Sequence, residues 1–117
     1  MNPLPPEYEE QFKLIKSRYI DNLNDKYENL RKLKDMVSIE NPNSKTLLDF
    51  LKEVHFNVHK LAGSSALMGF AEISSLAKTL ELLLQEILER GKFSYEGNFI
   101  THYEKLINEI EAAISNR

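Results

Sequence analysis

Two histidines lie four residues apart in the stretch Glu53–Phe70, which reads EVHFNVHKLAGSSALMGF. On a helix, His55 and His59 would lie one turn apart, which is also the spacing of paired zinc-binding histidines. Gly63 follows one turn later, although glycine costs roughly 1 kcal/mol relative to alanine inside a helix. A neutral imidazole is an available nucleophile near neutral pH, whereas a serine hydroxyl needs a base to activate it. The residue types therefore permit two chemistries, metal binding by a histidine pair and group transfer to one ring.

The direction of His59 follows from the helical repeat of about 100° per residue. If Leu47 is set at zero, the apolar residues within about 40° of it define the core direction: Leu47, Leu51, Val54, Val58 and Leu61. His59 then falls at about 120°, and Lys52, Phe56 and Gly63 fall between about 140° and 180°. His55 and Leu48 lie at about 80° and 100°, on the shoulder between core and solvent. The pattern predicts that His59 faces water or a partner.

The surroundings of His59 favour contact with another molecule. Gly63 has no side chain, so it leaves the imidazole uncovered and lets a partner's backbone come close. Phe56 is a large apolar group on the same outward face, which is typical of a docking surface. The alternative interpretation is structural: small residues permit close helix packing near a bend at Met68–Gly69, and single exposed aromatic residues are common.

Four amphipathic patterns separated by helix-breaking residues indicate the elements that position this stretch. The expected helices run from Pro5–Pro6 to near Val37, from the N-cap Ser44 to Met68–Gly69, from the Ile73 region to Arg90–Gly91, and from Phe99 to Ile114. No segment shows the two-residue period of a strand. We therefore predict an all-α protein, an antiparallel four-helix bundle, with a bent or split N-terminal helix as an alternative to a straight one.

Composition and charge limit the class of protein. The 117 residues, 42% of them hydrophobic, suit one domain spanning residues 1–117, with residues 1–6 and the last few frayed. Because the 15 basic residues are outnumbered by 18 acidic ones, we expect no nucleic-acid partner. No apolar run approaches the roughly 20 residues of a membrane span, and no secretory signal is visible. Together with the absence of cysteine, this favours a cytoplasmic protein.

A family resemblance rests on the residues around His59. His59–Ser65 reads HKLAGSS, and Gly69–Phe70, Leu76 and Leu80–Glu81 follow it. These residues resemble the signature of histidine phosphotransfer (HPt) domains, which carry phosphate in multistep two-component phosphorelays. Many members of that family have a lysine three residues after the histidine, where this chain has Ala62. A subset reads His, basic, Leu, Ala, Gly, and Lys60 places this chain with it.

The resemblance implies a phosphorelay carrier rather than a turnover enzyme. His59 would be the phospho-acceptor, taking a phosphoryl group from the aspartyl phosphate of a receiver domain and passing it on or returning it. The implied partners are a response-regulator receiver domain, a hybrid sensor kinase, or both. The resemblance implies no cofactor in this chain, since the receiver would supply the magnesium ion.

The same analogy assigns roles to the neighbours of His59. Three residues would adjoin the phosphate or keep the site open: Lys60, Gly63 and Ser64. Five would contact the partner protein: Leu48, Lys52, His55, Phe56 and Met68.

Three other hypotheses remain open at the level of sequence. A zinc site formed by His55, His59 and His102 lacks the glutamate of the metalloprotease motif, so we expect no metal, and we expect His102 to be a surface residue. A bundle of the same family that binds a receiver or kinase without being phosphorylated would have a nearly identical sequence. Finally, the first helix has a broad apolar face that is a candidate for dimerisation, although we expect a monomer: Tyr19, Ile20, Leu23, Tyr27, Leu30, Leu33 and Val37.

Overall fold

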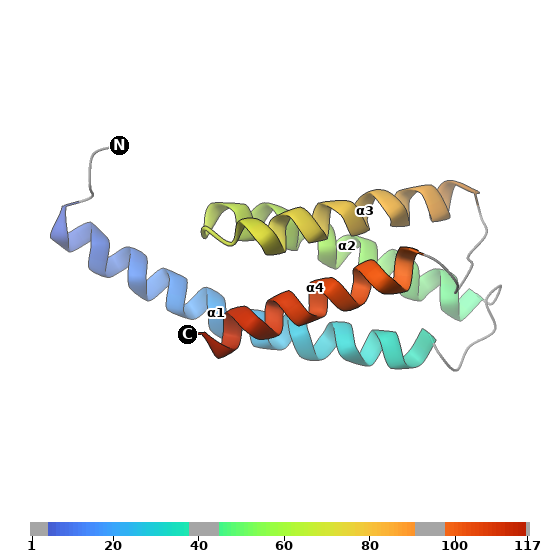
Figure 1. Cartoon of the computed structure of the whole chain (residues 1–117), viewed down its shortest axis with the longest axis horizontal. Coiled ribbons are helices and arrows are strands. Elements are labelled where there is room, and N and C mark those ends of the chain that lie inside the picture. The colour runs from blue at the N-terminus through green and yellow to red at the C-terminus, as the bar shows by residue number, and fades with distance from the viewer. Residues whose placement is uncertain (1–4, 38–44, 91–97, 117) are drawn as a thin grey trace.

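The computed structural model describes residues 5–37, 45–90 and 98–116, and it is helical almost throughout (Figure 1). The helices are α1 (Pro6–Val37), α2 (Lys45–Leu67), α3 (Ala71–Arg90) and α4 (Asn98–Ser115). They run alternately up and down, and each packs against its neighbours in the order α1, α2, α3, α4 and back to α1. The predicted all-α antiparallel four-helix bundle is confirmed. The predicted N-cap Ser44 and C-cap Gly91 lie outside the described residues.

The core is made by the apolar stripes of all four helices. Its fully buried members include Leu23 and Leu30 of α1, Val54 and Val58 of α2, and several residues of α3 and α4: Ile73, Ala77, Leu80, Leu84, Tyr103, Leu106 and Ile110. The most extensive contact is between α2 and α3. A buried hydrogen bond of 2.7 Å, donated by the Ser74 hydroxyl to the Ala62 carbonyl, joins these two helices. The α2–α3 pair is therefore a well-anchored platform for side chains on its outer face.

Helix α1 is a single helix, so the sequence-based alternative of a split helix is wrong. The Pro5 carbonyl accepts the first helical hydrogen bonds, and Pro6 occupies the first helical position, where its missing N–H has no cost. The N-terminal turns project beyond the bundle (Figure 1). We call residues 6–18 the arm. It makes the molecule elongated, 54 × 24 × 20 Å with a radius of gyration of 16.1 Å, against about 13 Å for a compact chain of this length.

The apolar stripe of α1 has two different environments. Ile20, Leu23, Leu30 and Leu33 are buried inside the chain's own bundle. Most of the face that the sequence offered for dimerisation is therefore used for folding, and these four residues are not available to a second copy. Tyr8, Phe12 and Ile15 continue the same stripe along the arm but are exposed, because no other described helix extends beside them.

The turn between α2 and α3 depends on Gly69. The Phe70 N–H donates to the Ser65 carbonyl at 2.8 Å, and the Gly69 N–H donates to the Ala66 carbonyl at 3.3 Å. This pair of bonds is the Schellman arrangement that ends many helices. It needs a left-handed residue, and Gly69 has φ +84°. The Phe70 carbonyl then accepts from the Ser74 N–H at the start of α3. The turn thus brings α3 back along α2 with only three residues between the helices.

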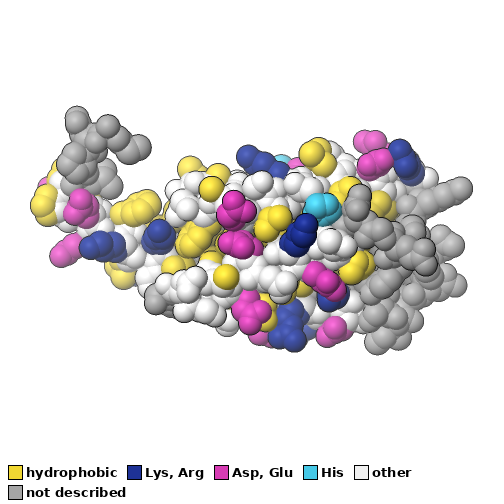
Figure 2. All heavy atoms as spheres, in the orientation of Figure 1, with side chains coloured by type: hydrophobic (Ala, Val, Ile, Leu, Met, Phe, Trp, Pro, Cys, Tyr) yellow, Lys and Arg dark blue, Asp and Glu magenta, His cyan; other side chains and the backbone are white. Residues whose placement is uncertain are grey.

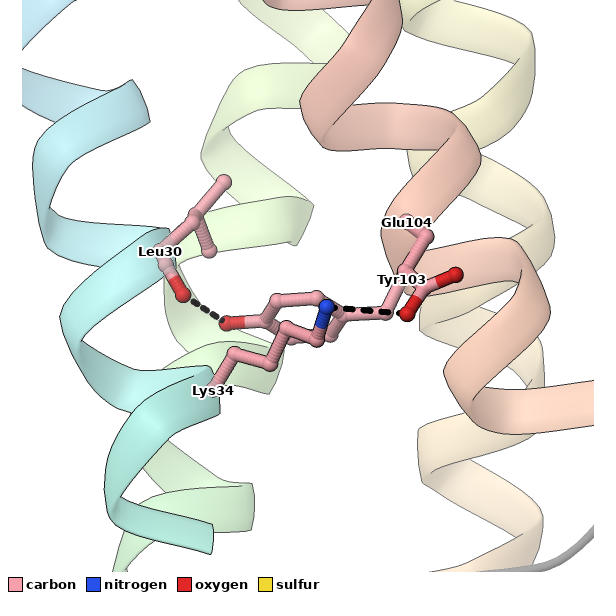
Figure 3. A network of polar contacts seen from close by, with 4 residues as sticks. All are labelled: Leu30, Lys34, Tyr103 and Glu104. Carbon is pink, nitrogen blue, oxygen red and sulfur yellow. Dashed lines mark hydrogen bonds and ion pairs between the residues drawn. The ribbon is translucent and has the colours of Figure 1, made fainter. Parts of the chain in front are cut away.

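A polar contact inside the bundle joins α4 to α1 (Figure 3). The buried Tyr103 hydroxyl donates to the Leu30 carbonyl at 2.7 Å, and beside it Lys34 forms a 2.8 Å ion pair with Glu104. Burial raises the pKa of the Tyr103 phenol well above its usual range, and the negative charge of Glu53 raises it further. The neutral phenol is therefore the form that stabilises the fold.

We expect Tyr103→Phe to lower the free energy of unfolding by about 1 kcal/mol near neutral pH, the usual value of one hydrogen bond. Because the folded-state pKa is raised, the contribution of Tyr103 is complete below the unfolded-state pKa of about 10 and is lost as the pH rises above it. The deficit of the variant should therefore shrink above about pH 10. Urea unfolding of both proteins across this pH range measures the difference. A deficit that stays constant would contradict the titration of Tyr103.

Candidate functional site

Helix α2 presents His59 to solvent. The five residues of its core stripe, Leu47 to Leu61, are all buried, and Val58, directly before His59, is completely so. The His59 side chain is 68% exposed. The outward direction predicted from the helical repeat is confirmed, and a buried structural role for this imidazole is excluded.

Glu81 of α3 holds one nitrogen of the His59 ring. The distance between His59 Nδ1 and Glu81 Oε1 is 2.9 Å, and the Glu81 side chain is only 20% exposed. A carboxylate accepts hydrogen bonds, so it selects the form of the neutral ring in which Nδ1 carries the proton. The lone pair of the ring is then on Nε2. The contact therefore fixes both the orientation of the ring and the position of its nucleophilic atom.

Sequence reasoning did not assign this role to Glu81. Leu80–Glu81 was part of the family resemblance, but the contact joins residues 22 positions apart on different helices. The spacing of residues along α2 contains no information about such a pair. The buried residues Ala77, Leu80 and Leu84 set the rotation of α3, which places Glu81 on the side towards α2. A pattern search for a carboxylate beside the apolar stripe of the following helix would have found it as a candidate.

Gly63 leaves open space next to His59. It is exposed, and a Cβ atom built on it would meet no atom within 4 Å apart from its own immediate helix. Close packing between helices therefore does not require glycine here, which removes the structural interpretation of this residue. The surface beside the imidazole is bare backbone, one turn along α2.

Phe56 and Lys60 lie together on the outer face of α2. Phe56 is 61% exposed, and the Lys60 Nζ atom lies 5.0 Å from the centre of its ring, a cation–π contact. Lys52 and Leu48 are exposed on the same helix. His55 is half-buried, as its shoulder position predicted. The structure thus places an apolar ring with a cation above it one turn from His59.

Two predicted neighbours of the site are less close to it. The Ser64 hydroxyl lies 2.8 Å from the Tyr19 hydroxyl, which is also 2.8 Å from that of the buried Ser65, so Ser64 is directed towards α1. Met68 lies in the turn after α2 and is half-buried, about 13 Å along the helix axis from His59 at 1.5 Å per residue. The structure therefore groups His59, Glu81, Gly63, Lys60 and Phe56, with Ser64 and Met68 at the periphery.

The structure gives no support to a zinc site formed by His55, His59 and His102. Within the described residues, no group of three or more His, Cys, Asp or Glu side chains is placed to hold a metal ion. His102 lies on α4 and is half-buried with its Nδ1 enclosed, so the expectation that it is an ordinary surface residue is wrong.

Of three comparisons with known proteins, one found a match. Searches of curated proteins and of solved structures found no match. In the parts of the chain that the structure describes, no helix has the length and apolar character to cross a membrane. A family model described as "Hpt domain" matches residues 16–116, which contain His59, Gly63 and Glu81. The chain therefore belongs to the Hpt domain family, the histidine phosphotransfer carriers of two-component phosphorelays.

Proposed function

We propose that this chain accepts a phosphoryl group on His59 Nε2 from the aspartyl phosphate of a receiver domain, and passes it on or returns it. The observation that carries the proposal is that the His59 ring is both exposed to solvent and held in one orientation. His59 is 68% exposed, and its Nδ1 is engaged by Glu81 at 2.9 Å. An exposed ring with a fixed direction meets the main requirement of phosphoryl transfer, which is positioning.

The transfer step can be written on the atoms of this site. The Nε2 lone pair attacks phosphorus in line, the N–P bond forms, and the bond between phosphorus and the aspartyl oxygen breaks. The electron pair of that bond leaves with the receiver's carboxylate. The imidazole ring gains positive charge, which the Glu81 carboxylate offsets while accepting the Nδ1–H hydrogen bond. The receiver domain would bring the magnesium ion that neutralises the phosphoryl oxygens.

The surroundings of His59 supply the features that a receiver would need for docking. Gly63 allows a backbone or loop to approach the ring. Phe56 and Leu48 are exposed apolar residues of α2 that a partner would cover, and Lys52 and Lys60 would face its acidic phosphorylation pocket. We place His55, Ser64 and Met68 at the edge of this contact.

Incubation with a panel of phosphorylated receiver domains tests the proposal. Mass spectrometry under alkaline conditions, which preserve phosphohistidine, should find one phosphoryl group on the peptide that contains His59. If a receiver binds but no member of the panel transfers a phosphoryl group, the result would instead select the alternative, a regulatory bundle that is not phosphorylated.

Glu81→Ala is expected to slow phosphoryl uptake by roughly tenfold, the lower end of the loss seen when the hydrogen-bond partner of a metal-binding histidine is removed. Glu81→Gln should retain most of the rate, because its amide oxygen can still accept the Nδ1–H hydrogen bond. Stopped reactions followed by phosphoprotein gels give the rates. The ¹⁵N chemical shifts of the His59 ring should show loss of the Nδ1–H form in Glu81→Ala alone. Equal rates in both variants and the parent protein would contradict the positioning role.

A further inference from the structure

The arm carries an apolar stripe that the bundle leaves uncovered. Tyr8, Phe12 and Ile15 are all exposed, and Figure 2 shows hydrophobic side chains along this projection with charged ones beside them. The family match begins at residue 16, so nearly the whole arm precedes the matched region. Its apolar surface is therefore not explained by the packing of the phosphotransfer bundle.

The stripe has the spacing of a helix–helix seam. Tyr8, Phe12 and Ile15 are separated by steps of four and three residues, the heptad pattern of paired helices, and we call these three residues the seam. The next position of the pattern, Tyr19, is already covered, because its ring stacks on Phe70 of the bundle. At about 100° per residue, Tyr8, Phe12 and Ile15 fall within about 60° of one another, whereas Leu14 points to the opposite side of the helix. Ile15 and Leu14 are similarly exposed, 50% and 55%. The two differ in direction, and only Ile15 belongs to the seam.

Charges flank the seam in a self-complementary order. Glu9 and Lys16 lie on one flank, at about 60° and 40° from Phe12, and Gln11 and Arg18 lie on the other. Lys16 is held at the edge of the arm, with its Nζ 5.2 Å from the ring of Phe70. When two such helices run antiparallel with Phe12 opposite Ile15 of the other copy, Glu9 of each copy faces Lys16 of the other. A two-fold axis makes both ion pairs at once.

We infer that the arm is a dimerisation element, and that a second copy of this chain covers it in an antiparallel pair. A parallel pair would bring both bundles to the same end of the seam and would leave Glu9 without Lys16 opposite it. The antiparallel pair places the bundles at opposite ends. It also leaves the His59 face of each copy free, since the arm lies at one end of the bundle and His59 lies within α2. This assembly differs from the monomer expected from the sequence.

The size of the seam sets its strength. The arm is about 20 Å long at 1.5 Å per residue, which gives an interface at or below the lower limit of standard size. We therefore expect dissociation in the micromolar range, and sedimentation equilibrium of the full chain across that range measures it. The apparent mass should rise from 13.6 kDa towards twice that value.

The neighbouring residues Ile15 and Leu14 provide a matched pair of variants. Ile15→Asp places a charge in the seam and should weaken dimerisation by more than about tenfold, whereas Leu14→Asp should leave it unchanged. Circular dichroism of both variants checks that the bundle is still folded. Equal effects of the two substitutions would overturn the assigned face, and a parent protein that stays monomeric throughout would overturn the inference itself.

Charge exchange tests the antiparallel register. Glu9→Lys and Lys16→Glu should each weaken self-association, because like charges then face each other twice across the seam. The double variant should dimerise as the parent does. An equimolar mixture of the two single variants should form heterodimers, since every Lys then faces a Glu. A mixture that stays monomeric while the parent dimerises would overturn this register.

Discussion

His59→Gln is expected to abolish phosphoryl uptake from a phosphorylated receiver, with little change in the circular dichroism spectrum or melting temperature. The amide of glutamine has no nucleophilic nitrogen that can replace Nε2, so the loss should be complete rather than partial. The fold should not depend on this ring, because its side chain is 68% exposed and its hydrogen bond to Glu81 lies at the surface. Radiolabel transfer or mass spectrometry gives the first result, and thermal unfolding gives the second.

His102→Gln is the matched control for this prediction. It removes the same kind of side chain from α4, whereas His59 and its partner Glu81 lie on α2 and α3. Uptake should persist in this variant at close to the parent rate. If His59→Gln still takes up phosphate, or if both variants lose uptake together, the assignment of His59 as the acceptor is refuted.

Gly63→Gln is expected to lower the rate of transfer by roughly ten- to hundredfold, which corresponds to the 1–3 kcal/mol that an inserted side chain usually costs in a packed contact. The new side chain would occupy the space through which a receiver approaches His59 Nε2. The isolated protein should fold at least as well as the parent, because a Cβ at this position meets no atom within 4 Å and helical glycine is unfavourable by about 1 kcal/mol.

Two controls separate access from folding in this second prediction. Gly63→Ala should raise the free energy of unfolding by up to about 1 kcal/mol and keep most of the transfer rate. Ala112→Gln adds the same side chain to an exposed position of α4 and should change neither property. A Gly63→Gln protein that transfers phosphate at the parent rate would show that the open surface beside His59 is not used.

Periodicity along single helices predicted most of what concerns α2. The stripe from Leu47 to Leu61 was sufficient to give the direction of His59, because a side chain's angle on a helix depends only on its position in the sequence. The exposure of Phe56 and the open space at Gly63 followed from the same count. Each of these properties depends on the direction of a side chain on α2 alone, so the sequence of α2 was sufficient to predict it.

Contacts between side chains of two different helices were not predicted. The pairing of His59 with Glu81 requires the rotation of α3 relative to α2, and the direction of the Ser64 hydroxyl requires Tyr19 of α1. The exposed arm is a related case. Tyr8, Phe12 and Ile15 continue the stripe that Leu23 and Leu30 begin, and periodicity identifies the face of a helix but not how far a neighbouring helix extends beside it.

The elongated outline has a practical consequence for measuring the mass of this protein in solution. A particle 54 Å long and 24 × 20 Å across experiences more hydrodynamic drag than a sphere of equal volume. A single copy should therefore elute from a size-exclusion column ahead of a globular standard of 13.6 kDa. Calibration against globular standards would overstate its mass, whereas light scattering reads mass without reference to shape.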